Sequence, residues 1–448
     1  MDLKNHIEKS SQIILAKSIA PTNFLWIPLI IVLFGCQKQS DTRPLFTLLG
    51  SEETGIDFSN DLEHSYEFNM YTYRNFYNGG GVGLGDINND GLTDIFFCGN
   101  MTDNKLYLNK GNLQFEDVTA QAEVASKNVW STGVSFADVN GDGWLDIYVC
   151  KSGKPGGEQR HNELFINQGL SVAETEVAGK VPRFKEMAKD YGIADEGFSS
   201  HASFFDFDRD GDLDCYLLNN SFRPIGQYDI RPGLREVRDS LGANKLYRND
   251  LEYSKEGDST RIKFTDISQE AGIYGSSIGF GLGVTTGDVD RDGWQDIYVS
   301  NDFFERDYLY INQHDGTFKE DLINQMPEIS LGSMGADMAD INNDGYPEVF
   351  VTEMLPESET RYKTKMTFEN WDKYQLNVRN GYHHQFPRNV LQLNNRNSTF
   401  SEVGRLAGVH ATDWSWSALI ADFDNNGFKD IYVSNGIYKD LLDQDYVN

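Results

Sequence analysis

Short runs of β-branched and aromatic residues, each bounded by glycine, asparagine or aspartate, recur along residues 46–448. One such run, Ile-Tyr-Val, occurs at residues 147–149, 297–299 and 431–433. Runs of this length and composition that end at turn residues predict β-strands rather than helices. The pattern therefore predicts an all-β chain built from many short strands.

The predicted strands recur in a fixed order, which defines a repeat of four strands. A glycine-rich strand comes first and an Ile-Tyr-Val strand second. The third strand ends in asparagine, at Asn109, Asn249, Asn312 and Asn394. The fourth begins at a phenylalanine, at Phe115, Phe184, Phe264, Phe318 and Phe400. Four short strands per repeat, separated by turn residues, are typical of a propeller blade and not of a helical solenoid.

An acidic loop joins the first two strands of each repeat. Its pattern, Asp-x-Asn/Asp-x-Asp/Asn-Gly-x-x-Asp/Glu, occurs six times, and successive first acids lie 52 to 82 residues apart. The shortest spacing is about the length of one four-stranded blade, so the excess is insertion. We expect the inserts near residues 151–183, 217–243 and 353–388.

This arrangement resembles the FG-GAP and VCBS repeats of the integrin α-chain propeller. It is also similar to bacterial repeat proteins that carry an ASPIC/UnbV module, although no such module is recognisable here. The resemblance covers residues 46–448 and implies an all-β propeller of four-stranded blades. Members of such families typically have about seven blades. The six recognisable repeats therefore predict an incomplete ring.

Both ends of the repeat region carry partial blades. The sixth repeat shows only its first two strands, up to residue 434. The segment from Phe46 to Phe58 resembles a fourth strand with its turn, as expected where an N-terminal strand closes the last blade of a propeller. We therefore expect that the natural protein is longer and that this sequence is a fragment or an early stop. The unpaired strand edges would then be sites for association.

The acidic loops have the composition of a calcium site. Oxygen ligands stand at positions 1, 3, 5 and 9, a glycine at position 6 permits a tight turn, and position 7 offers a backbone carbonyl. Ca²⁺ accepts six to eight oxygen ligands in flexible geometry, whereas Mg²⁺ requires a stricter octahedron. Hairpin turns alone also favour Asp, Asn and Gly, but a turn needs only one or two such residues. Crowded carboxylates repel one another unless a cation neutralises them.

We therefore expect up to six Ca²⁺ ions, one in each loop. The ligands predicted for the first three loops are Asp86, Asn88, Asp90, Asp94, Asp138, Asn140, Asp142, Asp146, Asp206, Asp208, Asp210 and Asp214. Those of the last three are Asp288, Asp290, Asp292, Asp296, Asp340, Asn342, Asp344, Glu348, Asp422, Asp424, Asn426 and Asp430. The sixth loop has asparagine at position 5 where the others have aspartate, so its affinity should be among the weakest.

A second set of candidate residues lies at the start of the first strand of each repeat, eight residues before the loop. The innermost strand of a blade runs from one face of a propeller to the other, so these residues should ring the central opening opposite the loops. Aromatic rings at a concave mouth can bind a sugar or a peptide. The aromatic candidates are Trp130, Phe198, Phe280, Trp414 and the nearby Trp416. Packing between blades is the alternative explanation.

Residues 1–35 resemble an export signal, in which lysines precede an apolar run over residues 24–35. That run is too short to span a bilayer. The sequence Leu-Phe-Gly-Cys that ends at Cys36 resembles the lipobox of bacterial lipoproteins, and an ordinary signal peptide or an uncleaved anchor is the alternative. We expect a signal peptide over 1–35, lipidation of Cys36 as the mature N-terminus, a linker over 37–45 and the propeller over 46–448. The protein would then be anchored in a bacterial cell envelope, in the periplasm or at the cell surface.

Composition and motifs narrow the function. The net charge of −30 argues against nucleic acid, since phosphate binding needs clustered Lys and Arg. Cys98 and Cys150 share one offset in two repeats where later repeats carry Ser or Thr, which favours packing over redox chemistry. His383 and His384 in an expected insert leave a calcium-dependent carbohydrate-active enzyme, such as a polysaccharide lyase, as the alternative. We expect a recognition, adhesion or scaffold module that binds a glycan or an envelope protein.

Overall fold

The computed structural model describes residues 44–437 except 128, 154–159, 171–179, 223–232, 251, 254–259 and 366–369. The expected signal peptide and Cys36 lie outside the described residues. Thr47–Asn448 form one compact unit, and of the other unit, Met1–Phe46, only residues 44–46 are described. Within the described part of the chain, no helix is long and apolar enough to cross a membrane.

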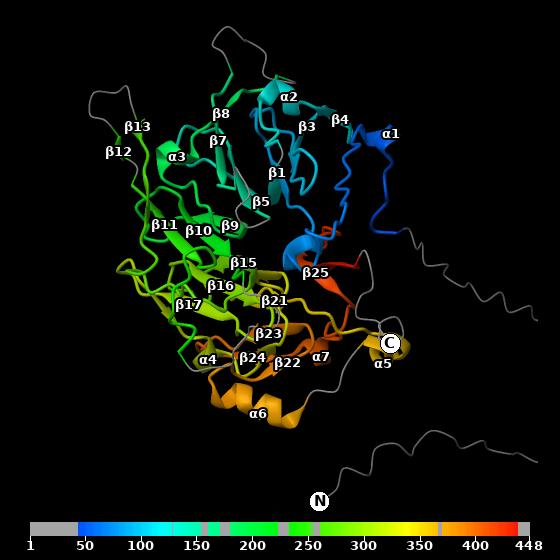
Figure 1. The fold of residues 1–448 in the computed structure, drawn as a ribbon, viewed down its shortest axis with the longest axis vertical. Coiled ribbons are helices and arrows are strands. Elements are labelled where there is room, and N and C mark those ends of the chain that lie inside the picture. The colour runs from blue at the N-terminus through cyan, green and yellow to red at the C-terminus, as the bar shows by residue number, and fades with distance from the viewer. Residues whose placement is uncertain are drawn as a thin grey trace, which may run out of the picture. The chain divides into compact units, whose positions relative to one another are not determined.

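In the described residues, five four-stranded antiparallel sheets and a final two-stranded sheet follow one another along the chain (Figure 1). Two further strand pairs lie outside this series, β12 (Glu252–Tyr253) with β13 (Thr260–Arg261) and β19 (Ile329–Ser330) with β22 (Gln385–Phe386). Sheet 1 contains β1 (Val82–Gly85), β2 (Asp94–Phe97), β3 (Lys105–Asn109) and β4 (Phe115–Asp117), and sheet 2 contains β5 (Trp130–Ala137), β6 (Asp146–Ser152), β7 (Glu163–Asn167) and β8 (Phe184–Glu186). Sheet 3 contains β9 (Ser199–Phe205), β10 (Asp214–Asn219), β11 (Lys245–Asn249) and β14 (Phe264–Asp266), and sheet 4 contains β15 (Gly281–Gly287), β16 (Asp296–Asn301), β17 (Tyr308–Asn312) and β18 (Phe318–Glu320). Sheet 5 contains β20 (Ala336–Ala339), β21 (Glu348–Val351), β23 (Val390–Asn394) and β24 (Phe400–Glu402), and sheet 6 contains β25 (Ser415–Ala421) and β26 (Asp430–Asn435).

Each sheet is a propeller blade, numbered here as its sheet. The first strand of each blade contacts the first strand of the next, from β1 through β5, β9, β15 and β20 to β25. The fourth strands begin at the phenylalanines that the sequence pattern marks. The all-β propeller fold that the sequence predicts is therefore confirmed.

A short helical turn follows the fourth strand in four blades, as α2 (Thr119–Ala122), α3 (Ala188–Tyr191), α4 (Leu322–Gln325) and α7 (Gly404–Ala407). The same turn appears at α1 (Ser51–Thr54), before the first blade. Its left-handed glycine, Gly55, sits against the carbonyl of Phe115, as Gly192 sits against Phe264 in a later blade. The expected turn before blade 1 is thus present, but residues 46–49 form no strand.

The expected inserts are narrower than the sequence pattern indicates. The range 151–183 contains β7, the third strand of blade 2, whose Glu-Leu-Phe-Ile-Asn sequence is a further copy of the asparagine-ended strand. The range 217–243 begins inside β10. The range 353–388 carries two helices, α5 (Glu359–Lys365) and α6 (Trp371–Arg379), and the short strand β22 (Gln385–Phe386), which pairs with β19 (Ile329–Ser330).

The core lies between neighbouring blades. One apolar cluster combines Tyr148 and Leu164 of blade 2 with Leu217 and Phe264 of blade 3. Cys98, Cys150 and Cys215 are buried as free thiols, in line with the packing role that the shared offset of Cys98 and Cys150 predicts. By contrast, Val82 and Leu84 on β1 are 56% and 63% exposed. An exposed apolar strand of this kind is a surface that can associate with another chain.

The asparagine that ends the third strand joins each blade to the one before it. Nδ2 of Asn312 donates to the carbonyl of Phe207 in the loop of blade 3, at 2.8 Å, and to the carbonyl of Gln295 in its own loop, at 3.3 Å. Asn167, Asn249 and Asn394 repeat this pair of bonds in blades 2, 3 and 5. Asn109 in blade 1 makes only the bond to its own loop, at Thr93.

Asn312→Ala should therefore lower the free energy of unfolding more than Asn109→Ala does. Both substitutions remove a bond within the blade and an acceptor for a turn amide, but only Asn312→Ala strands the buried carbonyl of Phe207. We expect a loss of about 1–3 kcal/mol for Asn312→Ala and about 1 kcal/mol less for Asn109→Ala. Equilibrium urea unfolding measures both, and equal losses would show that the bond between blades contributes nothing.

Candidate functional site

The acidic loops are shaped by their first aspartate. In the first loop Asp86 accepts the amide of Asp90 at 3.1 Å and the amide of Gly91 at 2.7 Å. The glycine at position 6 has φ +85°, a left-handed conformation that glycine adopts without strain. Position 4 is also left-handed, for example at Arg291 with φ 64°. The carboxylate at position 1 thus folds the loop back on itself and turns its oxygens inward.

The acid at position 9 connects the loop to the sheet. The two oxygens of Asp296 accept the amide of Val289 in the loop and the amide of Asn312 at the end of β17, both at 2.9 Å. The same pair of bonds is made by Asp94, Asp146 and Asp214. Asp296 is only 1% exposed, and burial raises its pKa to about 7.

In the described residues, three of the four predicted ligands come together in each of loops 3, 4 and 6. Carboxylate oxygens lie within 4.8 Å of one another in three groups, namely Asp206, Asp208 and Asp210; Asp288, Asp290 and Asp296; and Asp422, Asp424 and Asp430. Loops 1, 2 and 5 have asparagine at position 3, which can supply an amide oxygen in the same place. These donor sets consist of oxygen atoms, as a hard divalent cation prefers.

Two position-5 carboxylates also contact nitrogen-bearing side chains. Asp344 accepts two bonds from the Arg396 guanidinium, at 2.6 and 3.1 Å, and Asp292 contacts His314. Both partners are about half exposed. Because exposed ion pairs contribute little, these contacts can yield to a metal ion.

Neighbouring loops contact each other through position 4. Arg209 stacks over Trp294 of the next loop at 5.3 Å, and Asn343 donates to the carbonyl of Gly427 at 2.9 Å. Asn89 donates in the same way to the carbonyl of Gly143 at 3.0 Å. The loops therefore form a connected series along one face of the propeller.

The predicted aromatic ring does not form one site. Trp130 is buried against Phe68, Tyr73 and Phe76, with ring centroids 5.2 to 5.5 Å apart. Trp414 and Trp416 lie 6.1 Å from each other on blade 6. Phe198 and Phe280 are buried, and both line a cavity at the ends of blades 3 and 4.

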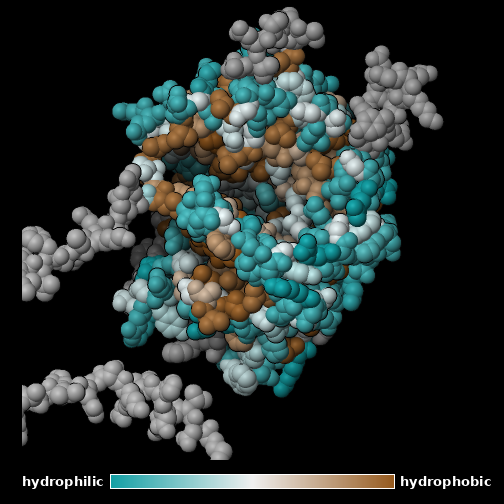
Figure 2. Space-filling model, turned by 180° about the vertical axis from the view of Figure 1, so that it is seen from behind, coloured by the Kyte–Doolittle hydropathy of each residue, from teal (hydrophilic) through white to brown (hydrophobic). Residues whose placement is uncertain are grey.

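The segment over residues 62–77 is the part that sequence reasoning missed. It contains the short helix η1 (Arg74–Tyr77), and its aromatic residues cover Trp130. Figure 2 shows one face of the molecule, where apolar side chains surround a central hollow. The signal that could have revealed this segment is the density of aromatic residues in Phe-Asn-Met-Tyr-Thr-Tyr-Arg-Asn-Phe-Tyr, which fits no strand of the repeat.

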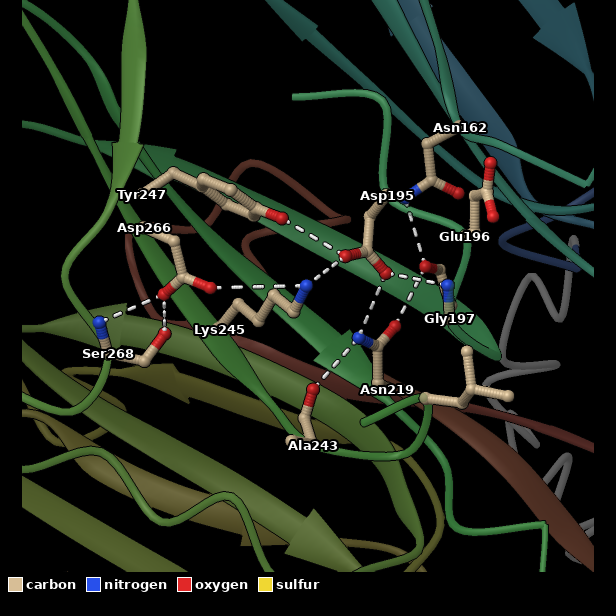
Figure 3. Close-up of polar contacts among 12 residues, drawn as sticks. Asn162, Asp195, Glu196, Gly197, Asn219, Ala243, Lys245, Tyr247, Asp266 and Ser268 are labelled. Carbon is tan, nitrogen blue, oxygen red and sulfur yellow. Dashed lines mark hydrogen bonds and ion pairs between the residues drawn. The ribbon is translucent and has the colours of Figure 1, made fainter. Parts of the chain in front are cut away.

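A buried polar cluster between blades 2 and 3 has a structural role (Figure 3). Asp195 accepts bonds from the Tyr247 hydroxyl at 3.0 Å and the Gly197 amide at 2.8 Å, and it pairs with Lys245. Blade 1 repeats the arrangement, because Asp57 accepts from the Tyr107 hydroxyl at 2.8 Å. A cluster that recurs in two blades with its carboxylate oxygens bonded joins blades rather than acting on a substrate.

The histidine pair of the third insert is also engaged. His383 Nε2 lies 2.7 Å from the carbonyl of Met326, and His384 Nδ1 lies 2.6 Å from the Tyr374 hydroxyl. Burial lowers the pKa of His383. The His383 ring therefore holds the insert against the rest of the chain, and the His384 ring makes a contact within the insert.

The FG-GAP-like repeat family matches residues 86–149 and 288–351, which run from the acidic loop of blade 1 into the second strand of blade 2 and from the acidic loop of blade 4 to the second strand of blade 5. Together with the fold, these matches show that the chain carries FG-GAP-like repeats on a β-propeller.

The chain is similar in sequence to cartilage acidic protein 1. It is 28% identical to the Xenopus tropicalis protein over 51% of this chain and 29% of that protein, and 26% identical to the Mus musculus protein over 57% and 34%. Integrin alpha-6 of Homo sapiens is 33% identical over 17% of this chain and 8% of that protein. The match thus spans about a third of cartilage acidic protein 1.

Two solved structures resemble the fold at low similarity. A lectin of Agrocybe aegerita, described as recognising non-reducing terminal N-acetylglucosamine, has a TM-score of 0.41 and 15% identity over 79% of this chain and 74% of that chain. The V. cholerae biofilm matrix protein Bap1 has a TM-score of 0.34 and 12% identity over 77% and 41%.

The position-9 acids predict how stability depends on pH when no metal is bound. Burial raises the pKa of Asp146 and Asp296 to about 7 and that of Asp214 to about 8, against about 4 in the unfolded chain. Their protonated forms therefore stabilise the fold below about pH 4, and this contribution is lost as the pH rises through 7 to 8. We expect the melting temperature of metal-free protein to fall between pH 5 and 8. Differential scanning calorimetry after dialysis against chelator measures it, and a rising curve would contradict the prediction.

Proposed function

We propose that this chain is a calcium-stabilised propeller that acts as a recognition or adhesion module of a bacterial cell envelope. The observation that carries the proposal is the FG-GAP-like repeat, which the chain shares with integrin alpha-6, combined with oxygen-rich loops at the hairpins of six successive blades. The polar cluster around Asp195 and the histidine pair are held in structural contacts, which favours recognition over catalysis.

Calcium would act through the charge of the loops. Position-1 and position-3 residues would hold the ion, and the position-9 acid would be kept ionised between the loop and the third strand. A divalent cation supplies the positive charge that buried carboxylates otherwise lack. Because these acids also bond to strand ends, metal binding would stabilise the seams between blades as well as the loops.

The proposed location rests on the N-terminal sequence. An apolar run that ends at Cys36 supports export and lipid anchoring at the membrane, with the propeller facing the periplasm or the cell exterior. The partner would be a glycan or an envelope protein. The acidity of the chain favours such partners over nucleic acid.

Calcium removal should lower the melting temperature in a single cooperative step. A site with a ligand concentration 100 times its Kd contributes about 2.7 kcal/mol to the folded state. Asp288→Ala should reduce the calcium-dependent rise in melting temperature, whereas Glu357→Ala, at an exposed carboxylate outside the loops, should leave it unchanged. A wild-type melting temperature that is the same in calcium and in EGTA would refute the calcium proposal.

Immobilised protein should retain a glycan or an envelope protein without altering it. A glycan array and a pull-down from envelope extract measure retention. Incubation with acidic polysaccharides, followed by assays for new reducing ends and for unsaturated uronate absorbance, measures cleavage. Retention without cleavage is the expected result. Cleavage by the wild-type chain would refute the proposal of a recognition module and favour a polysaccharide lyase.

A further inference from the structure

A cavity of about 280 Å³ lies at the end of blades 3 and 4 that faces away from the acidic loops. One wall comes from residues 71–75, and the other from Phe198, Asn220, Phe222 and Phe280. The volume is close to the lower end of the range for small-ligand pockets. The cavity is therefore large enough for one compact ring and too small for a folded peptide segment.

Aromatic side chains form most of the walls. The rings of Phe198 and Phe222 stack at 4.7 Å, and Arg160 covers Phe198 at 4.4 Å. Phe222 remains 38% exposed and Tyr71 79% exposed. Two aromatic side chains are thus accessible at the mouth of the cavity, where the apolar C–H face of a sugar ring can pack.

Asn220 adds a polar side chain that the described residues leave without a partner. It is 2% exposed, and neither Nδ2 nor Oδ1 of its side chain has a hydrogen-bond partner among the described residues. Burying an amide without hydrogen bonds destabilises a fold, so such a group requires an explanation. A ligand that offers a donor and an acceptor side by side would supply both missing bonds.

The equivalent asparagine of blade 1 shows that the fold can satisfy this position. Asn100 follows Asp94 by six residues, as Asn220 follows Asp214. Its Oδ1 accepts from Asn60 at 2.7 Å, and its Nδ2 donates to the carbonyls of Gly79 and Ser131. The third blade has the same residue at the same place, without these partners. The asparagine that lacks these side-chain partners is the one that lines the cavity.

Charge in the cavity wall is already balanced. The Arg74 guanidinium lies 4.1 Å from the centroid of the Phe303 ring, and its charge lowers the pKa of Asp302, which burial raises to about 6. The nearby cation and carboxylate oppose each other. A neutral ligand fits this environment better than an anionic one.

We infer that this cavity binds one neutral pyranose ring, which packs on Phe222 and Tyr71 while adjacent hydroxyls bond to the Asn220 amide. The inference rests on the proposed recognition function and assigns it a site and a ligand class. Adjacent hydroxyls of a pyranose present a donor and an acceptor at the spacing of a planar amide.

Isothermal titration calorimetry with neutral hexoses, N-acetylhexosamines and uronic acids, as mono- and disaccharides, tests the inference. Asn220→Leu removes both polar atoms and keeps the volume similar. Phe222→Ala removes an accessible aromatic face, and Phe46→Ala, at a 54% exposed phenylalanine outside the acidic loops, is its matched control. We expect at least a tenfold loss of affinity for a neutral sugar in the first two variants and none in the control.

The melting temperature of the Asn220 variant distinguishes a residue that binds a ligand from a residue that stabilises the fold. The Asn220 side chain has no hydrogen-bond partner among the described residues, so Asn220→Leu should keep or raise the melting temperature. A marked fall in the melting temperature would show that this amide stabilises the fold and would overturn the inference. Sugar binding that survives both variants would overturn this site and leave the proposed recognition function standing. Absence of binding by the wild-type chain to every sugar in the panel would also overturn the inference. The glycan array and the pull-down test the proposed recognition function separately.

Discussion

The seam between blades depends on the backbone of one residue, position 2 of the acidic loop, whose N–H and C=O are both bonded in loops 1 to 4. In the first loop the amide of Ile87 donates to the position-9 acid Asp94, and the carbonyl of Ile87 accepts from Asn167 of the next blade. The same acid also accepts the amide of Asn109 at the end of the third strand. A loop, its own sheet and the following blade are therefore fixed by a carboxylate and an asparagine.

This arrangement explains why an acidic sequence can form a closely packed fold. The position-9 acids lie at the seams, where burial raises the pKa of Asp94 to about 6 and of Asp214 to about 8. Without a cation, the seam favours protonated acids over ionised ones. A bound divalent ion would reverse that preference. Without metal, the free energy of unfolding would fall as the pH rises. At neutral pH, it would rise with the concentration of the metal ion.

Much of the fold could be predicted from the sequence because the repeat is local. Phe264 and Phe400 mark strand starts, and the loop pattern locates each first hairpin. The third strand of blade 2 was missed because Leu-Phe-Ile-Asn lacks the tyrosine of the copies in blades 1, 3 and 4 and follows an insert. The contacts of residues 62–77 could not be predicted, since the packing of Tyr73 and Phe76 on Trp130 joins parts of the chain that no repeat relates.

The two ends of the blades differ in a way that bears on recognition. At the loop end each blade carries nearly the same residues, because the hydrogen bonds that join blades require them. At the other end, six residues after the position-9 acid, the blades carry Asn100, Ser152, Asn220, Asp302, Met354 and Gly436. The bonds between blades that repeat there join backbone groups, as from the amides of Ser131 and Ser333 to the carbonyls of Gly99 and Asn301, so side chains can differ without loss of the fold. Variation at that end, together with an asparagine amide that has no partner in the described residues, is what a binding surface on a fixed scaffold requires.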